Sequence, residues 1–319
     1  MPANDTRDFH IDSLLTNLLV GFTPDGLIAP GIFPVVNVTK QTGIYAKVDK
    51  DAWYRQPSTL RAPGTAPREV NYTVSSATYN APNYELGTTV AWEVIDNADV
   101  PHQPMGLSAQ LVKTNLLLDF EIRVRNKVVA SVGSATTLSG TSAWSDFANS
   151  DPITDGEVAQ EAIRSTTGMY ANTMIMPQKT YLKMRRHPDI VRFLYPGAGV
   201  GGTATADQLA SVFGVDRILV PKAIQNTAAE GATATFTDVW STSCVLAYVA
   251  PAPGLMVPSY GYSFRWSGPN IGAGSPGNFA VQRRSDSKRK AEELQLGFYQ
   301  DEGIVAAELG FRIDTGITS

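Results

Sequence analysis

The chain has 319 residues, of which 43% are hydrophobic and 18% are charged. That length suffices for two or three compact domains, and the composition excludes an intrinsically disordered chain. The apolar runs "NLLLDF" (115–120) and "CVLAYVA" (244–250) are far shorter than the roughly 18 apolar residues of a membrane span, so we expect no membrane segment.

Charge and cysteine content exclude further classes of protein. The formal net charge is −4, whereas a chain that grips nucleic acid through its phosphates normally carries a basic face. This charge does not exclude a protein that encloses nucleic acid without binding its phosphates tightly. Cys244 is the single cysteine, so neither an intrachain disulfide nor a cysteine-rich metal site is expected. The start "MPANDTRDFH" has no basic region followed by an apolar core, and we expect a cytosolic protein.

Residues 1–40 predict an N-terminal arm that is first helical and then extended. In "FHIDSLLTNLLVGF" four leucines recur at helical spacing. Pro24, Pro30 and Pro34 then prevent a long helix.

Residues 41–80 predict a two-stranded arm with a wide, stiff tip. Ile44, Ala46 and Val48 share one face of the first strand, and alternate apolar residues of 70–74 share a face of the second. Between them, "RQPSTLRAPGTAPREVNY" (55–72) holds three prolines and four charges, and few residues suited to a core. A two-stranded ribbon is marginal on its own in water, so its apolar side chains need a surface to pack on. If the arm projects, that surface belongs to another molecule.

Residues 104–132 predict one long helix of roughly 40 Å. Leu107, Leu111, Leu118, Ile122 and Val129 recur at spacings that keep them on one face. The predicted opposite face is charged and carries Lys113, Asp119, Arg123 and Lys127.

Residues 151–250 alternate helical and strand patterns and predict one α/β unit. The predicted helices are a capped helix that ends at Gly168, two short helices broken at Pro188, and a helix from Thr205 to Gly214. "NTMIM", "DRILV" and "CVLAYV" are the predicted strands. Residues 251–319 return to strand patterns, and we expect "GIVAAELGFRIDTGI" to pair with strands near the long helix.

Chemical motifs are sparse. In "GAGVGG", Gly197, Gly199 and Gly202 match the dinucleotide-binding pattern, but a helical pattern precedes them where the fingerprint needs a strand. A flexible glycine-rich loop is the simpler interpretation. Cys244 lies in an apolar run, which favours a buried strand cysteine over a nucleophile.

Titratable residues show no catalytic or metal-binding spacing. His10, His102 and His187 are scattered, and we expect His187 to cap or end a short helix beside Pro188. Glu157 and Glu161 lie one turn apart near a helix start, where the helix dipole favours acidic residues. The basic run "RRSDSKRK" (283–290) fits a nucleic-acid patch, a solvated loop or a rim that pairs with acidic neighbours.

Several stretches together resemble one family. "APGIFPVVNVTKQTGIYAKVDKDAWYR" and "LRAPGTAPREVNYTVSSATYNAPNYELG" resemble the N-arm and extended loop of tailed-bacteriophage major capsid proteins, and "HPDIVRFL", "LASVFGVDRILVPKAIQNTA" and "VLAYVAP" resemble later segments of that family. The resemblance runs from about residue 28 to the C-terminus and implies an α+β chain with the Hong Kong 97-like capsid fold. Its expected parts are an N-terminal arm (1–40), an extended β-hairpin loop (41–80), a peripheral domain (81–150) with a spine helix at about 104–132, an axial α/β domain (151–250) and a return to the peripheral domain (251–319).

The resemblance also implies a function and partners. We expect a non-enzymatic shell protein without cofactors, which forms the hexamers and pentamers of an icosahedral phage head around double-stranded DNA and is assembled in the host cytoplasm. The extended loop would lie across a neighbouring subunit, with contacts from Trp53, Tyr54, Arg55, Leu60, Arg61 and Arg68.

Further partners and two alternatives complete the expectation. Because the chain begins close to the resembling N-arm, we expect a separate scaffolding protein, together with a portal and a decoration protein. Some family members are cross-linked between lysine and asparagine. Lys47 and Lys50 lie in the arm, but no full cross-linking site matches here. The alternatives are an encapsulin-like compartment around a protein cargo and, more remotely, a dinucleotide-binding enzyme.

Overall fold

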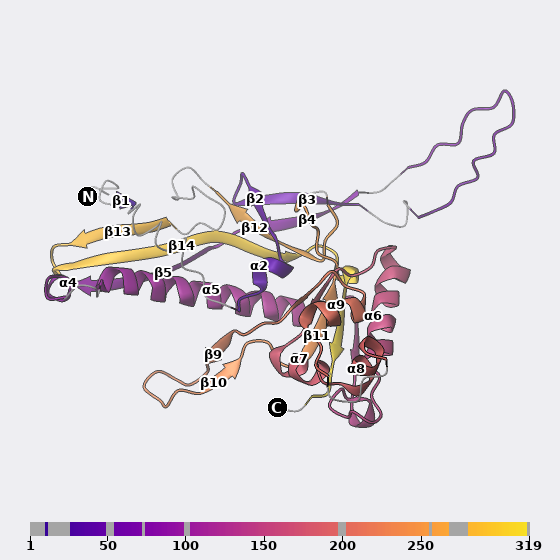
Figure 1. Ribbon diagram of the computed structural model, residues 1–319. Coiled ribbons are helices and arrows are strands. Elements are labelled where there is room, and N and C mark those ends of the chain that lie inside the picture. Colours follow the sequence, from indigo (N-terminus) through magenta and orange to yellow (C-terminus); the bar gives the residue numbers. More distant parts are fainter. Residues whose placement is uncertain are drawn as a thin grey trace.

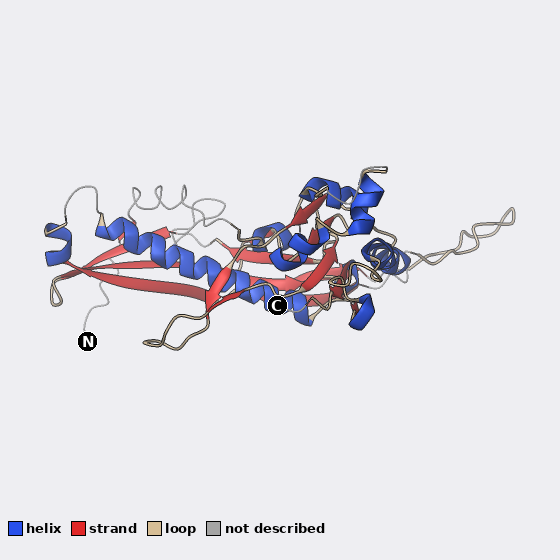
Figure 2. Cartoon of the chain, turned by 60° about the horizontal axis from the view of Figure 1, so that its bottom comes forward, coloured by secondary structure: helices blue, strands red, loops and turns tan. Residues whose placement is uncertain are grey.

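The computed structural model describes residues 10–11, 26–48, 54–71, 74–98, 103–196, 202–254, 257–267 and 280–317. The molecule is elongated: a long sheet with a long helix beneath it forms one end, and an α/β unit lies at the other (Figure 1). A thin loop projects from the α/β end, away from the long sheet, and it does so again in the rotated view of Figure 2.

The long sheet is built around β14 (Ala291–Ile304). β5 (Asn83–Ala91) pairs with it, as do β12 and β13, all antiparallel. Buried and half-buried residues alternate along β14, as expected of a strand with one face on a core. The other strands of this sheet are β1 (His10–Ile11), β2 (Val35–Val38), β12 (Gly261–Trp266) and β13 (Ala280–Asp286).

The predicted long helix is confirmed as α5 (Pro104–Ala130), with proline in its first turn. The predicted apolar face is correct only in part: Leu118 and Ile122 pack against the core, but Leu107 and Leu111 are exposed. Lys113, placed on the charged face, is buried. Since α5 packs on β14, β5 and α2 (Ala29–Ile32) together, the buried stripe is wider and rotated. It consists of Ala109, Val112, Leu116, Phe120, Val124 and Val128. The short helix α4 (Trp92–Asp96) precedes α5.

The α/β unit contains a five-stranded sheet in the order β6-β15-β11-β7-β8. The expectation that the last segment pairs beside the long helix is wrong for β15 (Gly310–Asp314), because β15 pairs antiparallel with β11 and parallel with β6. The chain therefore returns to the α/β unit after β14. The remaining strands are β6 (Ser134–Thr137), β7 (Thr173–Ile175), β8 (Arg217–Leu219) and β11 (Ser243–Ala247).

The predicted helices of this unit are confirmed, and local signals explain their ends. Gly168 ends α6 and Gly214 ends α9, each in the left-handed conformation that glycine adopts readily. Thr205 forms a capping box with Gln208. Pro188 separates α7 from α8. The helices are α6 (Pro152–Thr167), α7 (Gln178–Met184), α8 (Pro188–Leu194) and α9 (Ala206–Phe213).

The sequence patterns did not indicate a second ribbon that follows β8. β9 (Ile224–Asn226) and β10 (Phe236–Asp238) pair antiparallel and project beside α5 (Figure 1). Two short 3-10 helices, η1 (Gly140–Ser142) and η2 (Ala307–Leu309), complete the described elements.

The predicted two-stranded arm is present at its root. β3 (Thr42–Val48) pairs antiparallel with β4 (Val74–Asn80). The face that carries Ile44 is exposed, whereas Tyr45 and Tyr79 are buried against Phe264 of β12, at ring-centroid distances of 5.2 and 5.1 Å. Aromatic contact with the long sheet therefore holds the root of the arm to the body.

Candidate inter-subunit surfaces

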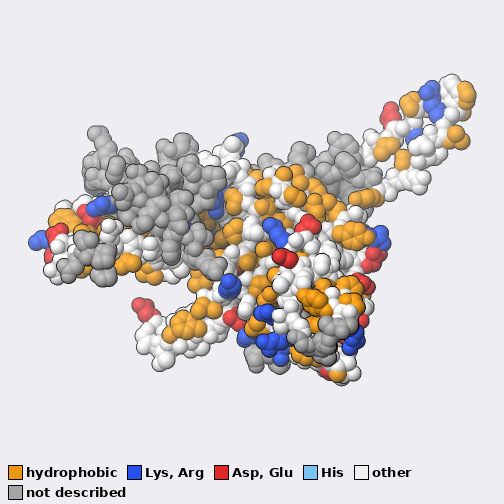
Figure 3. Space-filling model, in the orientation of Figure 1, with side chains coloured by type: hydrophobic (Ala, Val, Ile, Leu, Met, Phe, Trp, Pro, Cys, Tyr) orange, Lys and Arg blue, Asp and Glu red, His pale blue; other side chains and the backbone are white. Residues whose placement is uncertain are grey.

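The loop 54–71 is the most exposed segment that the structure describes. All of its residues are exposed except the half-buried Pro57, and Leu60 is 94% exposed. Its tip is nevertheless shaped by local bonds: the Arg61 guanidinium donates to the Thr65 carbonyl, the Thr65 hydroxyl donates to the Ala62 carbonyl at 2.8 Å, and Gly64 takes a positive φ of 81°. The loop therefore presents an ordered turn without burying it in its own chain (Figure 3).

The three arginines predicted as contact residues, Arg55, Arg61 and Arg68, are all exposed on this loop. Among the described residues, no ion pair within the chain joins any of them to a carboxylate. An exposed leucine beside unpaired cations is a surface suited to another molecule. Trp53, the remaining predicted aromatic contact, lies outside the described residues.

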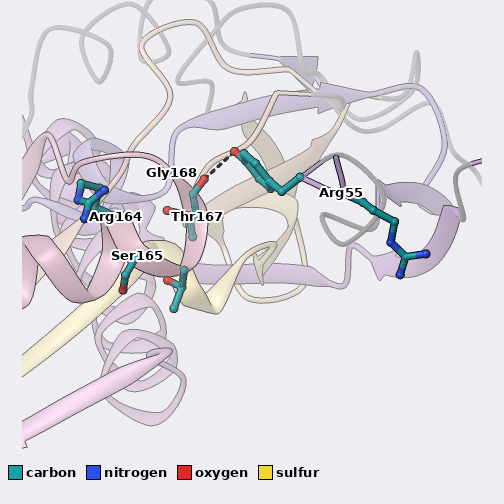
Figure 4. A pocket seen from close by; sticks show the side chains of 7 residues that line it. Arg55, Arg164, Ser165, Thr167 and Gly168 are labelled. Atoms are coloured by element: carbon teal, nitrogen blue, oxygen red, sulfur yellow. Dashed lines mark hydrogen bonds between the residues drawn. The ribbon is translucent and has the colours of Figure 1, made fainter. Parts of the chain in front are cut away.

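Tyr54, another predicted contact residue, has a hydrogen-bond partner in its own chain. It donates to the Thr167 carbonyl at the C-terminal end of α6, at 2.9 Å (Figure 4). Gly168 lies beside this contact, and a Cβ there would come within 3.0 Å of the Tyr54 hydroxyl. The residue as a whole remains 70% exposed. Tyr54 therefore ties the loop base to α6 and still offers apolar surface.

A groove of about 590 Å³ lies at this loop base. Tyr54, Arg55 and residues 164–168 line it. The Arg55 and Arg164 side chains point away from each other (Figure 4), and Arg164 pairs with Glu161. The groove lacks the converging polar groups of a built ligand site.

A buried carboxyl group fixes the N-terminal segment to α5. Glu121 accepts hydrogen bonds from the backbone N–H groups of Ile28 and Ala29 and, at 2.7 Å, from the Trp240 indole. Burial raises the pKa of the Glu121 carboxyl above its ordinary value, and these hydrogen bonds oppose the rise. One side chain thus joins α2, the middle of α5 and the segment that follows β10.

A second polar cluster joins α5 to β14. The Arg123 guanidinium donates to both oxygens of the buried Glu302 carboxylate, at 3.0 and 3.2 Å, and lies 3.5 Å from the centre of the Tyr84 ring. Gln300 donates to Glu302 at 3.0 Å and accepts from Arg265 at 3.0 Å. Glu302 is paired with Arg123, whereas Arg265 donates to the neutral Gln300 side chain. These bonds link α5, β12 and β14 and fix the position of the helix on the sheet.

The N-terminal segment is also tied to the α/β unit. A groove of about 310 Å³ separates them, and Arg217 bridges it. Its guanidinium donates to the Gly31 carbonyl at 2.9 Å and to the Thr173 hydroxyl at 3.1 Å. These bonds, together with the prolines that line the groove, describe a structural junction.

The candidate cofactor and nucleophile motifs show no reactive geometry where they are described. Gly197 and Gly199 lie outside the described residues, and Gly202 lies between α8 and α9, so a helix precedes the glycine-rich segment as predicted. Cys244 is buried in β11, and burial raises the pKa of its thiol far above the ordinary range. It is the predicted strand cysteine.

The titratable candidates have structural contacts. His187 is buried and caps α8, accepting from the Asp189 N–H, as predicted, whereas the side chains of His10 and His102 lie outside the described residues. Glu157 and Glu161 are exposed on α6. Within the described residues no cluster of histidine, cysteine and carboxylate side chains is suited to a metal ion.

The basic run 283–290 is partly neutralised. It forms the end of β13 and the turn into β14, where Arg283 pairs with Glu292 at 3.0 Å and Arg289 pairs with Asp286 and Glu293. Of the three interpretations of this run, the ion pairs favour a basic rim that pairs with acidic neighbours over a patch that binds nucleic-acid phosphates. None of the helices in the described part of the chain is long and apolar enough to cross a membrane.

Sequence comparison connects this architecture to known proteins. No family model matches the chain. It is 26% identical to the major capsid protein of Pseudomonas phage JBD67 over 316 residues, which cover 98% of both chains. It is 27% identical to the major capsid protein of Burkholderia phage BcepMu over 270 residues, 81% of this chain and 84% of the relative.

Solved structures share the fold. A phage-related protein from Bordetella bronchiseptica superposes with a TM-score of 0.71 at 24% identity, over 97% of this chain and 98% of its own. The capsid of cyanophage P-SCSP1u superposes with a TM-score of 0.58 at 10% identity, over 88% and 85%. An encapsulin complex from Synechococcus elongatus matches less closely, with a TM-score of 0.53 at 13% identity over 96% of both chains.

The fold alone does not separate phage capsids from encapsulins, but both curated sequence relatives are phage capsid proteins. Their matches span 98% and 81% of the chain. The chain is therefore a major capsid protein of tailed phages with the Hong Kong 97-like fold, a structural protein of the phage head rather than an enzyme.

Proposed function

We propose that this protein assembles into hexamers and pentamers that close into an icosahedral shell around double-stranded DNA, and that the loop 54–71 lies across a neighbouring subunit. The exposure of Leu60 on an ordered, projecting turn carries the proposal. Burying one leucine contributes about 1.5–3 kcal/mol, and that stabilisation is available only from another molecule.

The composition of the loop supports docking. Pro57, Pro63 and Pro67 restrict the backbone of the free loop, which lowers the conformational entropy lost when it docks. The exposed Arg55, Arg61 and Arg68 supply charged contacts at the rim, where they favour specificity over affinity.

Assembly of a loop deletion tests this part of the proposal. Removing residues 55–69 is expected to leave a soluble chain that forms no closed shells, as judged by electron microscopy. A finer variant is Leu60→Ser, with Thr59→Ser as the matched control on the same exposed turn. Normal shells from the deletion variant would show that the loop is not an assembly arm.

The contents of the shell separate the phage head from the encapsulin alternative. The acidic net charge of −4 fits an interior that packs DNA without gripping it. Shells produced alongside the other phage proteins are expected to hold DNA that survives external nuclease. An enzyme cargo in place of DNA would favour the encapsulin-like compartment.

The family resemblance further supports a scaffolding protein, a portal and a decoration protein as partners, and assembly in the host cytoplasm. Co-expression with the neighbouring phage genes tests the first of these, because shell yield should rise when the scaffolding partner is present.

A further inference from the structure

The β9–β10 hairpin is a second projecting arm. No residue from Ile224 to Asp238 is buried, whereas Ala223 and Val239, which close its base through a backbone bond of 3.0 Å, both are. Lys179 of α7 pairs with Asp238 at 3.5 Å and ties the base to the α/β unit. The base of the hairpin is thus fixed to the core, and the residues beyond the base are not buried in their own chain.

One face of this ribbon carries its two large apolar side chains, with Asn226 and Asp238 beside them. Asn226 pairs with Phe236 and Ile224 pairs with Asp238, so Ile224 and Phe236 lie diagonally on the same face. Phe236 is 65% exposed and Ile224 is exposed too, and Figure 3 shows hydrophobic side chains gathered there. Gln225 and Thr237 occupy the other face. Because a two-stranded ribbon is marginal alone, this face is suited to a covering surface.

The direction of the hairpin indicates which surface covers it. The hairpin projects to one side of the molecule, and the loop 54–71 projects to the opposite side (Figures 1 and 2). Copies arranged head to tail around an axis bring unlike sides together, so the hairpin side of one copy meets the loop side of the next.

The loop side carries a matching patch. α6 and α8 lie there, in contact with each other, and present Val158 and Phe193, the latter 61% exposed. Arg164 and Arg192 lie on the same two helices and are solvent-exposed, in surface ion pairs with Glu161 and Asp189. Because surface ion pairs are weak, both arginines remain available to Glu230 at the hairpin tip. The α6–α8 face therefore offers apolar contacts and cations to the hairpin.

We propose that the β9–β10 hairpin docks through Ile224 and Phe236 on the α6–α8 face of a second copy of this chain, as a second assembly arm that points opposite to the loop 54–71. The proposal rests on the proposed shell function. It adds a specific donor surface and a specific acceptor surface between adjacent copies in one ring.

Assembly of a face-specific variant is the first test. Ile224→Ser with Phe236→Ser is expected to raise the protein concentration needed for shell formation about tenfold or more, since burial of a large apolar side chain changes an association constant by about that factor. Gln225→Ser with Thr237→Ser, on the other face, is the matched control and should assemble as the wild type does. The four side chains are not buried, so the free subunit should keep its thermal midpoint.

Cross-linking gives a readout independent of yield. Ala229→Cys at the hairpin tip is combined with Val158→Cys on α6, and assembled shells are treated with a short bismaleimide. Cys244 is buried and should not react. The double variant is expected to give a ladder from dimer up to the ring size, whereas each single variant should remain monomeric on a denaturing gel.

The outcomes separate the two proposals. If the wild type forms no shells under any condition, the proposed function fails and this inference fails with it. If the wild type forms shells, but the hairpin variant assembles at the same concentration and the double cysteine variant gives no ladder, only the hairpin contact is overturned.

Discussion

Glu121 is the residue at which the N-terminal segment, the long helix and the α/β unit are joined. Its carboxyl group accepts three hydrogen bonds in a fully buried site. Glu121→Gln keeps the shape but places an amide N–H₂ among three donors. We expect a loss of about 1–3 kcal/mol in the free energy of unfolding, measured as a lower urea midpoint at pH 7.

The pH dependence of this loss has a predictable sign. The raised pKa of Glu121 means that the folded state binds its proton more tightly than the unfolded chain does. That contribution is present below the unfolded-state pKa of about 4.3 and is lost as the pH rises through the folded-state pKa. The stability advantage of the wild type over Glu121→Gln should therefore be larger at pH 4.5 than at pH 7.5. A larger advantage at pH 7.5 would contradict this assignment.

His187 gives a residue-scale prediction of the opposite sign. Its Nδ1 accepts from the Asp189 N–H, so Nε2 holds the proton and faces the Ser150 hydroxyl at 3.0 Å. Burial lowers the pKa of His187, although Asp189 and Asp151 oppose the shift. The stability from the neutral ring is present above the unfolded-state pKa of about 6.5 and is lost as the pH falls through the folded-state value.

A substitution that keeps the cap isolates this effect. His187→Asn retains an N-cap residue but does not titrate. Between pH 7.5 and 5, the urea midpoint of the wild type should fall more than that of His187→Asn. If the urea midpoints of the two proteins fell by the same amount over this pH range, His187 would not titrate in it.

At the scale of elements, Arg123 offers a comparison of a buried and an exposed partner. Glu302 on β14 is buried, whereas Asp119, one turn back on α5, is 53% exposed. Glu302→Ala removes the buried partner, leaves the largely buried Arg123 with the exposed Asp119 alone, and should cost about 3–5 kcal/mol. Asp119→Ala should cost less than about 1 kcal/mol. Denaturant titration of both variants decides whether the α5–β14 contact depends on this ion pair, and equal losses would refute it.

Elements with local signals were predictable from the sequence. The caps of α6 and α9 and the Pro188 break between α7 and α8 depend on residues within one or two turns, so pattern and structure agree. The buried face of α5 was not predictable, because three elements distant in the sequence cover it and leave Leu107 and Leu111 exposed. The pairing of β15 with β11 likewise depends on long-range contacts, which strand periodicity does not encode.

In the candidate inter-subunit surfaces too, features with local sequence signals were predicted and features that depend on long-range contacts were missed. Proline and arginine content indicated the projecting loop, including the exposed Leu60, because few of its residues are suited to a core. The bond from Tyr54 to α6 was missed, since its partner lies 113 residues away. The β9–β10 hairpin was missed as well: strands of three residues with small polar neighbours give too short a pattern.

At the scale of the whole molecule, the features suited to assembly are the two projecting segments, the loop 54–71 and the β9–β10 hairpin, rather than a pocket. A sheet with its long helix and an α/β unit supply a rigid frame, and the loop and the hairpin leave that frame in opposite directions (Figure 1). Each exposes apolar side chains that the frame does not cover. We therefore expect neighbouring copies in the capsid shell to cover both segments.

Electron microscopy of the purified protein, alone and co-expressed with the proposed scaffolding protein, tests this claim most directly. The account predicts closed icosahedral shells, or rings of five and six subunits where closure is interrupted. A chain that stays monomeric under every condition, with the scaffolding partner present, would contradict it.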